Sequence, residues 1–173
     1  EMCIRDSHGN VSEAGGFTIE CEHTPGHTSN HICYALKEVG ALFSGDHVMG
    51  WSTTVVSPPD GDMAAYMASL ELLRERRDKI YYPTHAGPII EPIPYLEALI
   101  AHRRERERQI MDCLGRGIGR IASMVDEMYP GLDPGLIPAA RCSGFSHIIA
   151  MAERGEIEPE GAIKAEGEYR LAG

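Results

Sequence analysis

The sequence predicts a protein of the α/β class, with alternating strands and helices in its first half and mostly helices in its second. In residues 17–22 apolar and polar side chains alternate, which is the period of a half-buried strand. From residue 62 the apolar residues recur at intervals of three, four and seven, as in a helix with one buried face. An apolar strand follows at 80–82, and the order strand, helix, strand is typical of an α/β layer.

Three strands are expected before the first helix. The strand at 17–22 is followed by two more, at 32–36 and 41–43, which a short turn connects. Asp62 is expected to cap the helix, because an aspartate side chain accepts hydrogen bonds from the free N–H groups of the first turn. The helix should end near 74–79, where basic residues suit its negative C-terminal end.

The second half is expected to be mostly helical. Pro94 suits the first turn of a long helix, and the charged run at 102–109 is interpreted as a solvated face of that helix. Two shorter helices are expected at 118–128 and 144–154, with a possible single helical turn between them. A hairpin closes the chain, and three small helices followed by a hairpin are typical of a winged-helix arrangement.

Composition narrows the class of protein. The chain has 173 residues, of which 43% are hydrophobic and 24% charged, as in soluble globular proteins. It contains no run of eighteen apolar residues and no basic-then-apolar opening, so neither a membrane span nor a secretory signal is predicted. Five scattered cysteines favour reduced thiols and a cytoplasmic location. The net charge of −10 argues against a nucleic-acid-binding module.

Three polar residues stand where a predicted strand gives way to a loop: His27, Asp46 and His85. Each lies close to a glycine that allows a sharp turn, so the four-residue spacing of the histidines around His27 is interpreted as a loop and not as a helix. Side chains at one end of a sheet can converge, and imidazole and carboxylate are ligands for divalent metals. Asp46 has two oxygens and could therefore bridge two ions. The sequence predicts a metal site.

The segments TPGHTSNH, FSGDHVMG and YPTHAGPI, in this order, resemble the third, fourth and fifth metal-binding motifs of the metallo-β-lactamase superfamily. They are most similar to its glyoxalase II-like and lactamase-B2-like hydrolases, and the resemblance covers residues 16–173. It implies that His27 binds the first of two divalent metals, that His85 binds the second and that Asp46 bridges both. Zinc is the expected metal, with iron or manganese as alternatives. Thr84 stands where the family usually has glycine.

The resemblance also implies a domain organisation. Residues 16–96 would be the C-terminal part of an αβ/βα sandwich, 97–116 a long linking helix and 117–173 a winged-helix-like domain, with 1–15 disordered or foreign to the fold. The family's His-x-His-x-Asp-His motif is absent, which predicts a fragment of a longer protein that is inactive alone. One apolar face of the sheet would then lack its partner, so we expect this chain alone to dimerise or to be poorly soluble.

Two classes of function compete. The first is a metal-dependent hydrolase that cleaves an ester or thioester bond of a small acyl substrate through a metal-bound hydroxide. The alternative is a nuclease or nucleic-acid-binding protein that uses the winged-helix tail. That alternative is less favoured because the tail shows no basic helix face: its helical part carries only Arg116, Arg120, Arg141 and Arg154. A third hypothesis makes the tail a dimerisation or substrate-cleft element.

The remaining polar residues have weaker assignments. His31 is expected to orient a metal ligand through a hydrogen bond and not to bind metal itself. Thr53 and Thr54 are expected near the substrate, on the resemblance alone. Three histidines are interpreted as surface or packed residues: His8, His102 and His147. Two more flank candidate ligands but match no motif position: His23 and His47.

Overall fold

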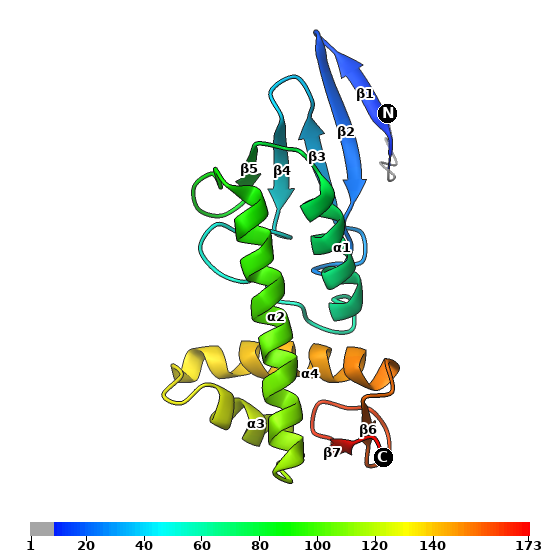
Figure 1. Ribbon diagram of the computed structural model, residues 1–173, viewed down its shortest axis with the longest axis vertical. Helices are drawn as coiled ribbons and strands as arrows, with labels where there is room; N and C mark the ends of the chain where they lie inside the picture. Colours follow the sequence, from blue (N-terminus) through cyan, green and yellow to red (C-terminus); the bar gives the residue numbers. More distant parts are fainter. Residues whose placement is uncertain (1–8) are drawn as a thin grey trace.

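The computed structural model describes residues 9–173 and contains one five-stranded sheet (Figure 1). The strands lie in chain order, and neighbours are antiparallel except β4 and β5, which are parallel and connected through helix α1. The strands expected at 17–22, 32–36, 41–43 and 80–82 are confirmed. The bounds are β1 Val11–Ala14, β2 Phe17–His23, β3 Ile32–Leu36, β4 Ala41–Gly45, α1 Met63–Glu75 and β5 Ile80–Pro83.

The beginning of the fold differs from the prediction. Residues 1–15 are expected from the sequence to lie outside it, but β1 pairs with β2 along its whole length. Gly15 and Gly16 both have positive φ and form the two-residue turn that this hairpin needs. The prediction is wrong for residues 9–15, because a short edge strand of sequence VSEA shows no alternation of apolar residues. Residues 1–8, and with them Cys3 and His8, lie outside the described residues.

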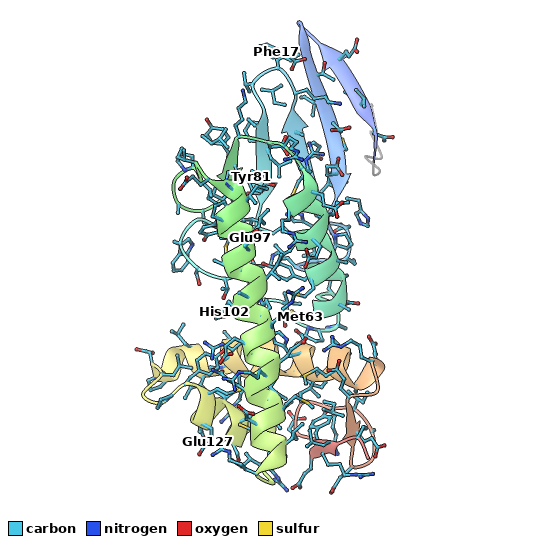
Figure 2. All side chains as sticks on the ribbon, viewed as in Figure 1. Phe17, Met63, Tyr81, Glu97, His102 and Glu127 are labelled. Atoms are coloured by element: carbon cyan, nitrogen blue, oxygen red, sulfur yellow. The ribbon has the colours of Figure 1, made fainter. Side chains whose placement is uncertain are left out.

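Two helices cover one face of the sheet and bury the main core (Figures 1 and 2). The helix α1 begins as predicted, since the Asp62 side chain accepts a hydrogen bond of 2.9 Å from the Ala65 N–H group. The second helix, α2 (Pro92–Gly115), starts two residues before the predicted Pro94. The core joins three layers of side chains, from α1, α2 and the sheet: Tyr66, Leu70 and Leu73; Leu96, Leu99 and Ile100; and Cys33, Ala35, Leu42 and Tyr81.

The opposite face of the sheet is apolar and exposed. Five of its large side chains retain between 37% and 51% of their accessible surface: Phe17, Ile19, Tyr34, Phe43 and Tyr82. The rings of Phe43 and Tyr82 stack on neighbouring strands with centroids 5.6 Å apart. A shallow hollow of about 500 Å³ lies over this face, lined mainly by Phe17, Ile19, Tyr34, Leu36 and Phe43. This is the surface through which the sequence predicts self-association, and that association stays a prediction.

The helix α2 continues past the sheet into a C-terminal unit with its own core (Figure 1). Helix α3 (Ile121–Met128) begins three residues after the expected residue 118, and α4 (Ile137–Glu153) begins seven residues before the expected residue 144. The predicted helical turn between them and the closing hairpin are present. The order of elements is the predicted one, and the winged-helix assignment stays a prediction. No helix in residues 9–173 combines the length and apolar character needed to cross a bilayer. The unit contains α3 Ile121–Met128, η1 Pro134–Leu136, α4 Ile137–Glu153, β6 Ile157–Pro159 and β7 Tyr169–Leu171.

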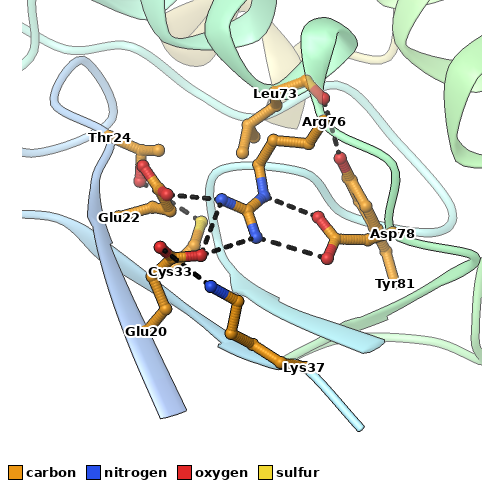
Figure 3. Close-up of polar contacts among 9 residues, drawn as sticks. All are labelled: Glu20, Glu22, Thr24, Cys33, Lys37, Leu73, Arg76, Asp78 and Tyr81. Carbon is orange, nitrogen blue, oxygen red and sulfur yellow. Dashed lines mark hydrogen bonds and ion pairs between the residues drawn. The ribbon is translucent and has the colours of Figure 1, made fainter. Parts of the chain in front are cut away.

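A cluster of charged side chains joins the end of α1 to β2 (Figure 3). Arg76 caps α1, and its Nε atom lies 2.6 Å from Asp78 Oδ2. Its Nη1 atom lies 3.4 Å from Glu20 Oε2 and also donates to Glu22. The side chains of Glu22 and Asp78 are less than 10% exposed, so Arg76 neutralises two carboxylates that water hardly reaches.

Replacing Arg76 by alanine is expected to lower the free energy of unfolding by about 3 kcal/mol, because it leaves buried carboxylates without a counter-charge. Arg76→Lys should recover only part of that loss, since an ammonium group cannot make the same forked contacts. Urea denaturation measures the effect, and Arg77→Ala, which changes the exposed neighbour, is the control. Equal losses in Arg76→Ala and Arg77→Ala would contradict this prediction.

His147 of α4 makes stability depend on pH. It is 1% exposed, its Nδ1 lies 3.4 Å from Glu107 Oε1, and its Nε2 has no partner among the described residues. Burial lowers the pKa of His147 below its ordinary value near 6.5, against the opposing effect of Glu107. As the pH falls through about 6.5, this histidine therefore takes up a proton more readily in the unfolded chain than in the folded one. The free energy of unfolding is expected to decrease as the pH decreases. His147→Gln should reduce the dependence of Tm on pH between about pH 7 and pH 5, and an unchanged slope of Tm against pH would refute this prediction.

Candidate functional site

The turn that carries His27 packs against α1. Gly26 has φ +136°, and a Cβ atom at this position would lie 2.3 Å from the Cα of Tyr66, so the turn requires glycine. The Gly26 carbonyl accepts a hydrogen bond of 2.9 Å from the Asp62 N–H group, which starts the helix. His27 Nδ1 lies 2.8 Å from the Val55 carbonyl oxygen and donates to it, which leaves Nε2 with a free lone pair. Residues 24–31 form a loop, as predicted.

Asp46 and His85 meet at one edge of the sheet. Asp46 directly follows β4 and His85 comes two residues after the end of β5; because these strands are parallel, the chain leaves both at the same end. His85 Nε2 lies 3.5 Å from Asp46 Oδ1. That oxygen is buried and accepts no hydrogen bond from the described part of the chain. The loop after His85 contains Ala86 at φ +73°, a conformation that costs an alanine energy and is typical of functional turns.

His31 lies beside this edge. Its ring centroid is 6.5 Å from that of His27, and its Nδ1 is 2.8 Å from Thr24 Oγ1. A Cβ atom on Gly45 would lie 2.6 Å from His31 Nε2, so glycine is needed for the ring to approach the backbone before Asp46. Burial, followed by His27, lowers the pKa of His31. His31 is therefore a neutral ring placed between the His27 turn and the Asp46 loop.

A buried polar network supports the Asp46 loop from below. Thr54 is 2% exposed, and its single hydroxyl proton is donated to the carbonyl oxygen of Asp46, with the His47 carbonyl oxygen at 3.2 Å as a second, longer acceptor. The Tyr66 hydroxyl also donates to the His47 carbonyl, at 3.1 Å. Arg103 of α2 is 3% exposed, donates from Nη2 to the Thr54 carbonyl, and has its guanidinium 5.1 Å from the Tyr66 ring centre. These contacts link the middle of α2 to the backbone of Asp46, the candidate metal-binding residue.

The network specifies one interpretation of the sequence and corrects another. Thr54 is expected close to the metal ligands or the substrate, and its buried side chain holds main-chain atoms of a candidate ligand; Thr53 is half-buried beside it, and a role of either residue near the substrate stays a prediction. Arg103 is expected on a solvated face, but it reaches inward and also donates to Ser143 of α4 at 3.2 Å. The signal was present, because Arg103 falls on the same helical stripe as the buried residues 96, 99, 100 and 110.

His47 sits behind the edge as a packed ring. It is fully buried, its centroid is 4.6 Å from that of Tyr66, and neither ring nitrogen has a partner in residues 9–173. Burial, followed by the charges of His31 and His27, lowers the pKa of His47 to about 3. The ring is therefore neutral and serves as part of the wall behind Asp46.

The chain supplies an incomplete set of metal ligands. Within the described residues, no three His, Cys, Asp or Glu side chains lie close enough together to hold one ion. Asp46 and His85 are in contact, and His27 is connected to them through His31, whose ring neighbours His27 and the backbone of Gly45. The unpartnered buried oxygen of Asp46 and the free Nε2 of His27 are nevertheless the groups that a divalent cation would satisfy.

Comparison with known proteins gives matches along most of the chain. The family model described as the metallo-beta-lactamase superfamily matches residues 4–85. The lactamase-like protein nscB of Arthroderma benhamiae is 34% identical over 160 residues, which are 92% of this chain and 33% of that protein. The atrochrysone carboxyl ACP thioesterase of Claviceps purpurea is 34% identical over 128 residues, 70% of this chain and 40% of that protein.

The fold is shared with a solved structure. A beta-lactamase domain protein from Burkholderia ambifaria superposes with a TM-score of 0.83 at 22% identity, and the match covers 97% of this chain and 52% of that one. The chain spans between about a third and a half of the length of the curated relatives it matches. Sequence and fold agree along both the sheet and the C-terminal unit, and the chain belongs to the metallo-beta-lactamase superfamily.

Proposed function

We propose that the complete protein is a metal-dependent hydrolase of ester or thioester bonds. The observation that carries this proposal is the pair formed by Asp46 and His85. A buried carboxylate oxygen without a hydrogen bond is costly unless a cation or a proton accompanies it. His85 Nε2 lies 3.5 Å from this oxygen, so one divalent ion could bind both side chains.

The residues of this edge would contribute to the binding of two divalent ions, with zinc as the expected metal and iron or manganese as alternatives. His27 would bind the first ion through Nε2, His85 the second, and Asp46 would bridge both. A catalytic zinc site has three protein ligands and one open position, so the other ligands would come from the part of the relatives that this chain does not span. When bound, the ions supply an activated water and polarise the acyl oxygen.

The chain's own residues would keep these ligands in place. The bond from His27 Nδ1 to the Val55 carbonyl fixes which ring nitrogen faces the metal. His31 separates the His27 turn from the Asp46 loop, and Thr54 holds the Asp46 carbonyl oxygen. The substrate class is supported by the relatives named as ACP thioesterases, and the glyoxalase II-like branch is also consistent with a thioester. The buried thiols of Cys33 and Cys113 form no disulfide within residues 9–173, which supports a cytoplasmic location.

The test is turnover by the complete protein. Hydrolysis of a small acyl thioester is followed with zinc, iron or manganese and after chelation, beside a single-stranded RNA substrate. We expect metal-dependent thioester hydrolysis that changes little between about 50 and 200 mM salt, because an uncharged acyl group releases no counterions on binding. RNA cleavage with a steep salt dependence, together with no thioester turnover, would establish the nuclease alternative instead.

A further inference from the structure

The C-terminal unit contains a second candidate site. A cavity of about 510 Å³ lies between the start of α3, the first half of α4, the loop before β7 and Pro58. This volume is in the range of small-molecule sites. Its floor is apolar, formed by Ile121, Ala122 and Phe145, and two arginines line it, Arg120 and Arg141. An apolar floor with a few charged groups is typical of a site for a ligand that is partly apolar and partly anionic.

The tertiary structure divides the four arginines of this segment into two pairs. Arg116 Nη2 is 2.9 Å from a Glu127 carboxylate oxygen. Arg154 is 2.9 Å from Glu107 and also contacts a second carboxylate, at 2.7 Å. The charges of these two arginines are therefore neutralised within the fold, which leaves the other two to account for.

The remaining two arginines face the cavity with few partners. Arg120 is 69% exposed, and its only ion pair among the described residues is a loose one of 3.5 Å with Glu168. Arg141 makes no hydrogen bond or ion pair with residues 9–173. Glu166 also lines the cavity, and together with Glu168 it equals the two arginines in number, but neither carboxylate contacts Arg141 within residues 9–173. Two under-used guanidinium groups at one cavity favour an anionic ligand.

One short loop connects the cavity to the metal-ligand edge, which is the end of the sheet that carries Asp46 and His85. Pro58 in the cavity wall is three residues from Val55, whose carbonyl accepts the hydrogen bond from His27. Three extended residues span at most about 11 Å. The loop is also fixed on α4, because Ser146 Oγ donates to the Val56 carbonyl at 3.1 Å. A ligand in the cavity would therefore lie one loop away from the His27 turn.

We propose that this cavity binds the phosphate-bearing arm of the thiol that leaves when a thioester is hydrolysed, with the phosphate on Arg120 and Arg141 and the uncharged chain against Phe145. The proposal rests on the proposed function. Arginine presents paired donors that match phosphate oxygens, and the apolar floor suits an uncharged chain. Two arginines beside the carboxylates of Glu166 and Glu168 are too few for a polyanion, so the cavity favours a single organic phosphate over a nucleic acid.

The test is a binding measurement on the complete protein, which needs no turnover. Titration calorimetry compares 4′-phosphopantetheine with pantetheine, which differ only in the phosphate. We expect the phosphate to tighten binding about tenfold or more, and Arg120→Gln and Arg141→Gln each to remove most of that difference. Arg77→Gln deletes an exposed arginine remote from the cavity and should change nothing. Coenzyme A and a carrier protein bearing the same arm, titrated in parallel, show which source binds more tightly, and Arg141-dependent binding of either supports the proposal.

Three outcomes would overturn it. The first is equal binding of the two probes. The second is an equal loss in Arg77→Gln and Arg141→Gln. The third is displacement of the probe by single-stranded RNA with a steep salt dependence, which would assign the cavity to nucleic acid. Thioester turnover without any effect of the phosphate would overturn this inference alone, whereas Arg141-dependent phosphate binding without turnover would overturn the proposed function and leave the anion site.

Discussion

Replacing Asp46 by asparagine is expected to lower kcat for thioester hydrolysis by the complete protein about 1,000-fold or more. The amide has nearly the same size as the carboxylate, and the hydroxyl of Thr54 would still hold the backbone of residue 46, so the fold should persist. What the substitution removes is the negative charge that two cations would share. Metal content, measured on the purified variant, should fall together with activity.

Variants of the neighbouring histidines sharpen this test. His27→Ala and His85→Ala should each lose one of the two metal equivalents, because each is assigned to a different ion. His23→Ala is the matched control: the residue ends β2 just before the His27 loop, its ring is exposed, and its Nε2 lies 3.1 Å from the Ser29 carbonyl oxygen. It should retain activity within about twofold. Full metal content and full turnover in Asp46→Asn would falsify the assignment of Asp46 as a metal-binding residue.

Replacing Arg103 by methionine is expected to lower the free energy of unfolding by about 2 kcal/mol. The methionine keeps the apolar stem, but the Thr54 carbonyl and the Ser143 hydroxyl lose their donor inside the protein. Because Thr54 in turn holds the Asp46 carbonyl, the loss should reach the metal-ligand edge. We expect metal affinity to weaken about 10- to 100-fold, as when a residue that positions a ligand is removed.

Urea denaturation and metal titration measure the two effects separately. Arg104→Met is the control, since Arg104 is the next residue on α2, is 66% exposed and contacts Glu71 at 3.0 Å. Its stability should change by less than about 0.5 kcal/mol, and its metal affinity should not change. If Arg103→Met lowers stability but binds metal as tightly as Arg104→Met does, Arg103 serves helix packing only and has no positioning role.

The local sequence was sufficient to predict features that depend only on residues close together in the chain. The alternating residues of β2, the Asp62 cap of α1 and the glycine turn before His27 follow from backbone sterics and from hydrogen bonds within a few residues. The same holds for the placement of Asp46 and His85 within two residues of the ends of their strands. These features needed no knowledge of the rest of the chain.

Features that depend on partners distant in the chain were not predictable in this way. The edge strand β1 carries no apolar alternation and exists because it pairs with β2. Arg103 has the composition of a surface residue, yet its donors reach Thr54 and Ser143, each at least 40 residues away. No pattern within α2 names those acceptors, although its position on the apolar stripe indicated burial.

By itself the sequence determined the class of fold, the loop positions of His27, Asp46 and His85, and the resemblance of their motifs to one superfamily, because each depends on residues close together in the chain. Only the tertiary structure decided that Asp46 Oδ1 is buried beside His85, and that Arg120 and Arg141 line one cavity with at most a loose ion pair, whereas Arg116 and Arg154 have carboxylate partners within 3 Å. The physical reason is that burial and charge neutralisation depend on the distance between side chains in space, and packing sets that distance.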